Sequence, residues 1–195
     1  MTAMFTIYSI MRIVKIFILK ATHGGRTISL ILSFLLFLVP LASPAIALSE
    51  RALSFYNTHT GERLTVIYKR HGKYIPVSLE KINHILRDHR TGGIHPIDPK
   101  LMDYLYDLQA KVGNHGAVHI ISGYRSPETN RQLRRNSKEV AKGSLHMQGK
   151  ALDFRLPGTD TVKLRDAARK MKRGGVGYYK KSDFIQIDTG RVRCW

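Results

Sequence analysis

Cysteine is almost absent from this chain of 195 residues, in which the only one is Cys194. A single cysteine excludes an intrachain disulfide, so the fold must be held together by its hydrophobic core. It also excludes a zinc site made of cysteines, and a residue next to the chain end is poorly oriented for nucleophilic catalysis. Any zinc site must therefore consist of histidine and oxygen donors.

Acidic residues are also scarce, with 14 aspartates and glutamates against 32 lysines and arginines, which gives a formal net charge of +18. Such an excess suits an anionic partner, of which nucleic acid, an anionic membrane surface and an anionic cell wall are the candidates. The charge can equally serve solubility alone. The sequence further lacks a Gly-x-Ser-x-Gly elbow, internal repeats and low-complexity linkers. A serine hydrolase of that type is therefore excluded, and one globular domain is expected.

The first 47 residues do not fit a globular domain. An apolar stretch at 28–41 follows Lys20 and Arg26 and precedes the small-residue pattern Ala45-x-Ala47. This order predicts a secretory signal, residues 1–47, cleaved after Ala47 and followed by a domain at 48–195. We therefore expect an exported protein of the periplasm or cell envelope, which disfavours nucleic acid as the partner. The alternative is an uncleaved anchor that associates with the membrane, although the stretch is short of the about 20 residues that a spanning helix needs.

The remaining sequence alternates between strand-like and helix-like patterns. Strands are predicted at 53–57, 63–70, 74–77, 117–122, 150–156, 176–179, 184–188 and 191–194. Helices are predicted after the capping residues Ser78, Asp98, Ser126 and Asp160, and residues 141–147 are expected to form a loop. The order predicts an α+β fold, a single domain with a central antiparallel sheet flanked by helices.

The stretch from Ser144 to Asp153 contains the densest set of chemically useful side chains. His146 precedes a predicted strand, and Asp153 points from one face of that strand. Imidazole and carboxylate are both good zinc ligands, and Gly149 and Ala151 leave room beside them. By spacing alone, a surface histidine and a salt-bridged aspartate would explain these residues equally well.

The pattern Ser-x-His-x-x-Gly-x-Ala-x-Asp resembles the metal motif of the LAS peptidases, the lysostaphin, D-alanyl-D-alanine peptidase and hedgehog group. Further stretches resemble one branch, the murein endopeptidase K-like family, at 53–62, 83–92, 121–127, 175–179 and 188–191. The resemblance extends from about Leu53 to Trp195. It implies the LAS-peptidase fold and a zinc peptidase that acts on the stem peptides or crosslinks of peptidoglycan.

The resemblance also implies three ligands for one zinc ion. Two of them correspond to His146 and Asp153, but the third position, where a histidine is expected, holds Gln186. An amide oxygen is a neutral and weaker zinc ligand than imidazole. Three alternatives follow: an active enzyme with reduced zinc affinity, a relative that binds peptidoglycan without cleaving it, or a third ligand supplied by His119 or His115.

A metal-assisted hydrolysis needs a general base and groups that hold the substrate. The base candidates are Asp183, because some related peptidases carry a glutamate at that offset, and Asp188, on the same strand face as Gln186. Either could instead be a turn or strand-edge carboxylate. Arg125 is the candidate for gripping a substrate carboxylate or stabilising an oxyanion. Ser144 is expected beside the substrate, where it orients His146 or its loop.

Overall fold

The structure is a computed structural model and describes residues 50–137 and 140–195. The predicted signal segment, residues 1–47, lies outside the described residues. Within the two described ranges, no helix is both long enough and apolar enough to cross a membrane.

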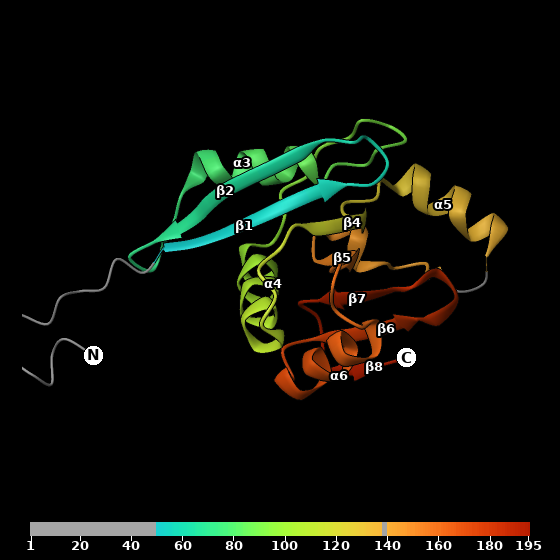
Figure 1. Cartoon of the computed structure of the whole chain (residues 1–195). Helices are drawn as coiled ribbons and strands as arrows, with labels where there is room; N and C mark the ends of the chain where they lie inside the picture. The colour runs from blue at the N-terminus through green and yellow to red at the C-terminus, as the bar shows by residue number, and fades with distance from the viewer. Residues whose placement is uncertain (1–49, 138–139) are drawn as a thin grey trace, which may run out of the picture. The chain divides into compact units, whose positions relative to one another are not determined.

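Eight strands form one sheet across the described part of the chain (Figure 1). Its order is β3-β2-β1-β4-β5-β7-β6-β8. The strands are β1 (Glu50–Asn57), β2 (Arg63–Arg70), β3 (Lys73–Tyr74), β4 (Val118–Ser122), β5 (Ala151–Arg155), β6 (Gly175–Tyr179), β7 (Phe184–Asp188) and β8 (Arg193–Cys194).

The sheet is mixed, so the prediction of an antiparallel sheet is correct for most neighbours and wrong for two pairs. β1 runs parallel to β4, and β6 runs parallel to β8. The first pair is parallel because the chain crosses over through β2, β3 and two helices before it returns as β4. For the second pair, β5 already occupies the free side of β7, so β8 can join the sheet only beside β6. The chain turns back after β7, which is antiparallel to β6, so β8 runs parallel to β6.

Four α-helices belong to the described residues: α3 (Pro76–Ile85), α4 (Pro99–Val112), α5 (Pro127–Asn136) and α6 (Thr161–Met171). The predicted caps Asp98, Ser126 and Asp160 are confirmed, because each side chain accepts a hydrogen bond from a backbone N–H of the first turn. The fourth predicted cap is wrong. α3 begins at Pro76, and Ser78 is buried inside it, because proline already fixes the backbone of the first helical position.

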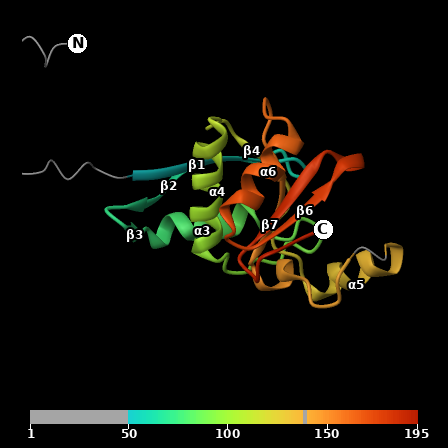
Figure 2. The ribbon, with the colours of Figure 1, turned by 90° about the horizontal axis from the view of Figure 1, so that it is seen from below.

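The hydrophobic core lies on one side of the strands that carry the motif. Leu152, Phe154, Ile185 and Ile187 alternate with polar residues along β5 and β7 and are fully buried. Helices α4 and α6 pack against each other, joined by a hydrogen bond from the Tyr104 hydroxyl, and α6 packs on β6 and β7 (Figure 2). The polar residues between these apolar ones therefore face the opposite side of the sheet.

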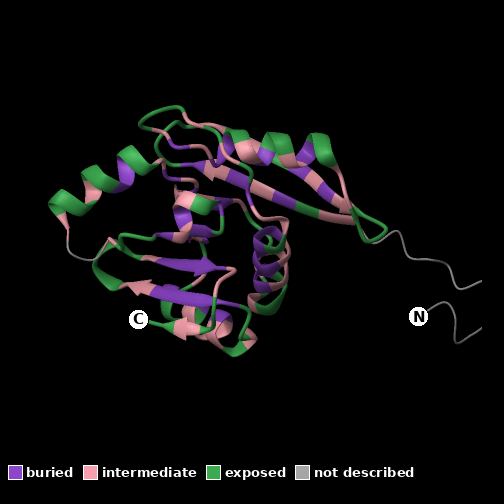
Figure 3. Ribbon diagram, turned by 180° about the vertical axis from the view of Figure 1, so that it is seen from behind, coloured by how far each residue is buried: buried purple, intermediate pink, exposed green. Residues whose placement is uncertain are grey.

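Helix α5 contributes little to this core. It extends away from the sheet in both ribbon views, and most of its length is exposed (Figure 3). Its buried residues are Thr129 and Asn130, near its first turn. The helix is therefore held mainly at its N-terminal end.

Candidate metal centre and active site

The polar face of two paired strands provides the base of the site. In the antiparallel register of β5 and β7, Asp153 lies opposite Gln186, and Ala151 lies opposite Asp188. Asp153 and Gln186 are both buried, with 6% and 9% of their surface exposed. Since side chains at paired positions share one face, the carboxylate and the amide are held side by side.

A short 3-10 helix, η1 (Leu145–Gln148), adds the histidine. The Ser144 hydroxyl caps this helix by accepting a hydrogen bond from the backbone N–H of His146 at 3.3 Å. Gly149 ends it with a φ of 63°, and a Cβ at this position would overlap the carbonyl oxygen of Pro96. Only glycine permits both the left-handed backbone and this close approach, so Gly149 fixes the position of His146 just before β5.

The hydrogen bonds of His146 leave its Nε2 atom facing two further acceptors. Nδ1 lies 2.7 Å from the carbonyl oxygen of Gly123, and since a carbonyl only accepts, Nδ1 carries a hydrogen. Nε2 lies 3.2 Å from Asp153 Oδ1 and 3.3 Å from Gln186 Oε1. Asp153 Oδ1 is buried and has no hydrogen-bond partner. The cluster therefore needs a positive charge at this point, either a proton on Nε2 or a cation.

The two distances from His146 Nε2 are compatible with ligands of one zinc ion. Zinc ligands lie about 2.0–2.2 Å from the metal, so neighbouring ligand atoms of a tetrahedral site are about 3.3 Å apart. The distances from His146 Nε2 to Asp153 and Gln186 match this spacing. The described residues contain no group of three His, Cys, Asp or Glu side chains that could hold a metal. The cluster of His146, Asp153 and Gln186 is not such a group, since its third donor is an amide oxygen.

The ion pair of the buried Asp188 with the partly exposed Arg193 orients the Gln186 amide. Gln186 Nε2 lies 3.4 Å from Asp188 Oδ2, which directs its Oε1 towards His146. Asp188 is completely buried and accepts hydrogen bonds from the backbone N–H groups of Gly175 and Gly190 and from both terminal nitrogens of Arg193. Asp188 therefore acts as a fixed acceptor behind Gln186.

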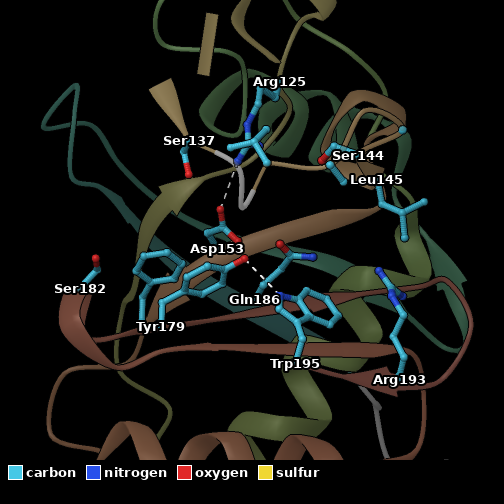
Figure 4. Close-up of a pocket in the computed structure, with 14 residues that line it drawn as sticks. Arg125, Ser137, Ser144, Leu145, Asp153, Tyr179, Ser182, Gln186, Arg193 and Trp195 are labelled. Atoms are coloured by element: carbon cyan, nitrogen blue, oxygen red, sulfur yellow. Dashed lines mark hydrogen bonds and ion pairs between the residues drawn. The ribbon is translucent and has the colours of Figure 1, made fainter. Parts of the chain in front are cut away.

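Arg125 lies above Asp153 at the other end of the cluster (Figure 4). Its NH2 atom is 3.3 Å from Asp153 Oδ2, and its backbone N–H donates to the carbonyl oxygen of His146. Burial lowers the pKa of the Arg125 guanidinium, while the Asp153 carboxylate acts in the opposite direction. The buried Nε atom has no partner, and the residue as a whole lines a cavity beside the cluster.

A cavity of about 420 Å³ opens beside this cluster. Arg125, Ser144, Asp153 and Gln186 line it together with a group of residues from the C-terminal strands, namely Tyr179, Phe184, Arg193 and Trp195. The rings of Tyr179 and Phe184 are stacked, and the Trp195 indole donates to the Tyr179 hydroxyl (Figure 4). The cavity thus has Arg125 and the His146 cluster on one side and an aromatic wall on the other, where the Arg193 guanidinium lies over the Trp195 ring.

The comparison with known families agrees with this arrangement. Residues 45–195 match the family model described as "Peptidoglycan L,D-endopeptidase MepK". The chain belongs to this family. The resemblance inferred from the motifs is therefore confirmed.

Two curated members of the family are close in sequence. The "Probable peptidoglycan L,D-endopeptidase MepK" of Haemophilus influenzae is 43% identical over 146 residues, which cover 74% of this chain and 78% of the relative. The "Peptidoglycan L,D-endopeptidase MepK" of Escherichia coli K12 is 46% identical over 145 residues, which cover 74% of this chain and 80% of the relative. No solved structure matches the chain.

The structure brings together five of the candidate residues and separates the two general-base candidates from the cavity. His146, Asp153, Gln186, Arg125 and Ser144 converge as described above. The exposed Asp183 accepts a hydrogen bond from Thr161 and is not part of the cavity lining. Asp188 lies behind Gln186, where its oxygens are occupied by the donors given above.

The two histidines considered as substitutes for the third ligand lie elsewhere. His119, on β4, packs edge-on against the ring of Tyr56 on β1. Burial lowers the pKa of His119, and the nearby Arg155 and Arg63 lower it further. His115 is exposed in the turn before β4. Neither lines the cavity, so Gln186 is the side chain that stands beside His146 and Asp153.

Sequence reasoning missed the contribution of Arg193 and Trp195. The signal that points to them is the alternation of Gly175 and Gly177 along β6. A Cβ on Gly175 would overlap the Arg193 guanidinium, and a Cβ on Gly177 would overlap the Trp195 ring. Two glycines on the same strand face thus mark the space into which these side chains fold.

Proposed function

We propose that this family member is an exported, zinc-dependent endopeptidase that hydrolyses peptide bonds in the crosslinks or stem peptides of peptidoglycan. Family membership and the activity for which its relatives are named support the reaction and the substrate class. The observation that carries the zinc assignment is the convergence of His146 Nε2, Asp153 Oδ1 and Gln186 Oε1 with no hydrogen bond to satisfy the buried carboxylate oxygen.

In this proposal His146, Asp153 and Gln186 hold the metal, and the other residues handle the substrate. A zinc ion in such a site lowers the pKa of bound water and polarises a scissile carbonyl. Arg125 lines the cavity, and in this proposal its guanidinium binds a substrate carboxylate or stabilises the negative charge that develops on the carbonyl oxygen. The carbonyl of Gly123 fixes the tautomer of His146, so Nε2 faces the metal position.

A second candidate function is peptidoglycan binding without cleavage, and two observations favour it. The third donor is a neutral amide, and a proton on His146 could supply the positive charge that the cluster needs. In addition, Asp153 is the only carboxylate in the described lining of the cavity, and it belongs to the cluster. The two functions share a substrate and differ in zinc content and turnover.

The decisive measurement is the zinc content of purified residues 48–195 together with the release of soluble fragments from isolated peptidoglycan. We expect one zinc ion per chain and fragment release that a chelator abolishes. Protein that binds peptidoglycan but neither holds zinc nor releases fragments would refute the endopeptidase and support the binding function.

The substitution Gln186→His tests the role of the amide separately. An imidazole at this position provides a stronger zinc ligand, so we expect tighter zinc binding than in the unmodified protein. The matched control is Gln148→His, because Gln148 is exposed and does not line the cavity. If Gln186→His leaves zinc affinity unchanged, position 186 does not contribute a ligand.

Export is part of the proposal and has its own test. The apolar stretch at 28–41 and the pattern Ala45-x-Ala47 support a signal removed after Ala47. N-terminal sequencing of the protein recovered from the cell envelope should begin at Leu48. Recovery of the intact N-terminus in the membrane fraction would instead support an anchor.

A further inference from the structure

Helix α5 presents a row of exposed arginines. Arg131, Arg134 and Arg135 are all exposed, and their spacing of three and four residues places them along one side of the helix. We refer to these three side chains as the arginine face. The single acid in the helix, Glu128, lies in its first turn.

The charges of the arginine face are uncompensated in the described part of the chain. No carboxylate of residues 50–137 or 140–195 forms an ion pair with any of the three guanidinium groups. By contrast, Arg51, Arg87 and Arg173 are each paired with an aspartate or glutamate. Three like charges on one helix repel one another, so the arrangement costs stability unless an anion is bound.

The position of α5 connects this face to the cavity. The helix begins at Pro127, two residues after Arg125, and Ser137, just beyond its last residue, lines the cavity together with Val140. Asn130 Nδ2 donates to the carbonyl oxygen of Ala141, which ties the returning chain to the helix. A ten-residue helix is about 15 Å long, so the arginine face extends the cationic surface outwards from the site.

We propose that the arginine face binds the acidic stem peptides of the peptidoglycan strand whose peptide enters the cavity. The identity of this partner rests on the proposed function. Stem peptides carry free carboxylates, which guanidinium groups bind in bidentate geometry. A polymer that repeats this anionic group along its length can occupy the cavity and the helix at once, and the helix then adds affinity without contacting the bond that is cut.

The test compares two triple variants with the same change in charge. The first is Arg131→Gln, Arg134→Gln and Arg135→Gln, since glutamine retains helix propensity and length. The control is Lys111→Gln, Lys163→Gln and Lys170→Gln, on the exposed surface of α4 and α6. Each protein is incubated with isolated peptidoglycan sacculi in the presence of a chelator, so binding is measured without cleavage, and circular dichroism verifies folding.

We expect the arginine-face variant to bind sacculi about tenfold more weakly than the unmodified protein, as three exposed charge contacts predict. The lysine control should bind as the unmodified protein does. Conversion of the sacculus carboxylates into amides should lower binding of the unmodified protein at least to the level of the arginine-face variant, because amidation also removes the carboxylate proposed to bind Arg125.

Three outcomes would overturn the proposal. Equal losses in the two variants would indicate net charge rather than this face. Undiminished binding to amidated sacculi would exclude carboxylates as the ligand. Arginine-dependent binding to phosphatidylglycerol vesicles, with no such dependence on sacculi, would assign the face to a membrane surface. Failure of the proposed hydrolysis affects none of these measurements, because they are made without turnover.

Discussion

Replacement of Arg193 by methionine tests the inference that a remote ion pair orients a metal ligand. Methionine keeps most of the aliphatic side chain and removes the guanidinium that donates to Asp188 Oδ1 at 3.1 Å and to Oδ2 at 2.7 Å. Asp188 then retains its backbone donors but loses its counterion. Its remaining contact with Gln186 no longer has a fixed position, so the amide is free to turn its oxygen away from His146.

The size of the effect follows from burial. Removing one partner of a buried ion pair costs about 3–5 kcal/mol, because the other charge remains buried. Asp188 is fully buried, but the Arg193 side chain is 31% exposed, so solvent already screens the pair and about 3 kcal/mol is the reasonable value. For a domain of about 150 residues this lowers Tm by about 6–12 °C. Loss of an orienting partner weakens metal binding by about 10-fold or more.

Urea unfolding measures the stability, and a competition titration with a zinc chelator measures the affinity. The control is Arg191→Met, because Arg191 is exposed and only two residues away. Arg193→Lys should restore part of the stability through its charge but little of the affinity, since lysine lacks the two-pronged donor geometry. Unchanged zinc affinity in Arg193→Met, at a temperature where the protein is folded, would refute the positioning role.

Three further predictions concern other parts of the site. Gly149→Ala should unfold at lower urea concentration than Gly72→Ala, because both residues have positive φ but only the first Cβ meets a backbone oxygen; equal losses would contradict this. Asp88→Asn should lose about 2 kcal/mol at pH 7. Asp88 accepts hydrogen bonds from the backbone N–H groups of Arg90 and of Ser126, the N-cap of α5 next to Arg125. Burial opposes ionisation of Asp88, but its hydrogen bonds outweigh burial and lower its pKa to about 2, so this stability is present above about pH 4 and disappears towards pH 2. Urea titrations should therefore give different free energies of unfolding for Asp88→Asn and the unmodified protein at pH 7, and similar values near pH 2. Trp195 is the only tryptophan and lines the cavity, so peptidoglycan fragments should change the intrinsic fluorescence; a flat titration with a fragment shown to bind would place the ligand elsewhere.

Local patterns in the sequence predicted most of the fold. The alternation along β5 and β7 and the caps Asp98, Ser126 and Asp160 depend on neighbouring residues, and the structure confirms them. The parallel pairs β1–β4 and β6–β8 depend instead on which strand edge is free when the chain returns to the sheet. A local sequence pattern does not predict which edge that is.

The candidate site shows the same division. The motif from Ser144 to Asp153 lies within one stretch of sequence and was recognisable there. The ion pair of Arg193 with Asp188 was not, because it depends on the turn that carries β8 back beside β6. Asp183 was proposed from its offset along the chain, whereas the left-handed backbone at this residue (φ 49°) directs the following strand and leaves the carboxylate with Thr161.

The three donors beside the proposed metal position come from η1, β5 and β7, and their orienting partners extend from Gly123 to Arg193. No short segment of the chain contains the cluster, so an unfolded chain offers zinc only scattered side chains. If the proposed zinc site is correct, zinc uptake is coupled to folding of the whole domain: a ligand that binds only the folded state at 100 times its Kd adds about 2.7 kcal/mol to stability. For a chain that crosses a membrane before it folds, this coupling would delay assembly of the hydrolytic centre until the domain has reached the compartment that holds its substrate.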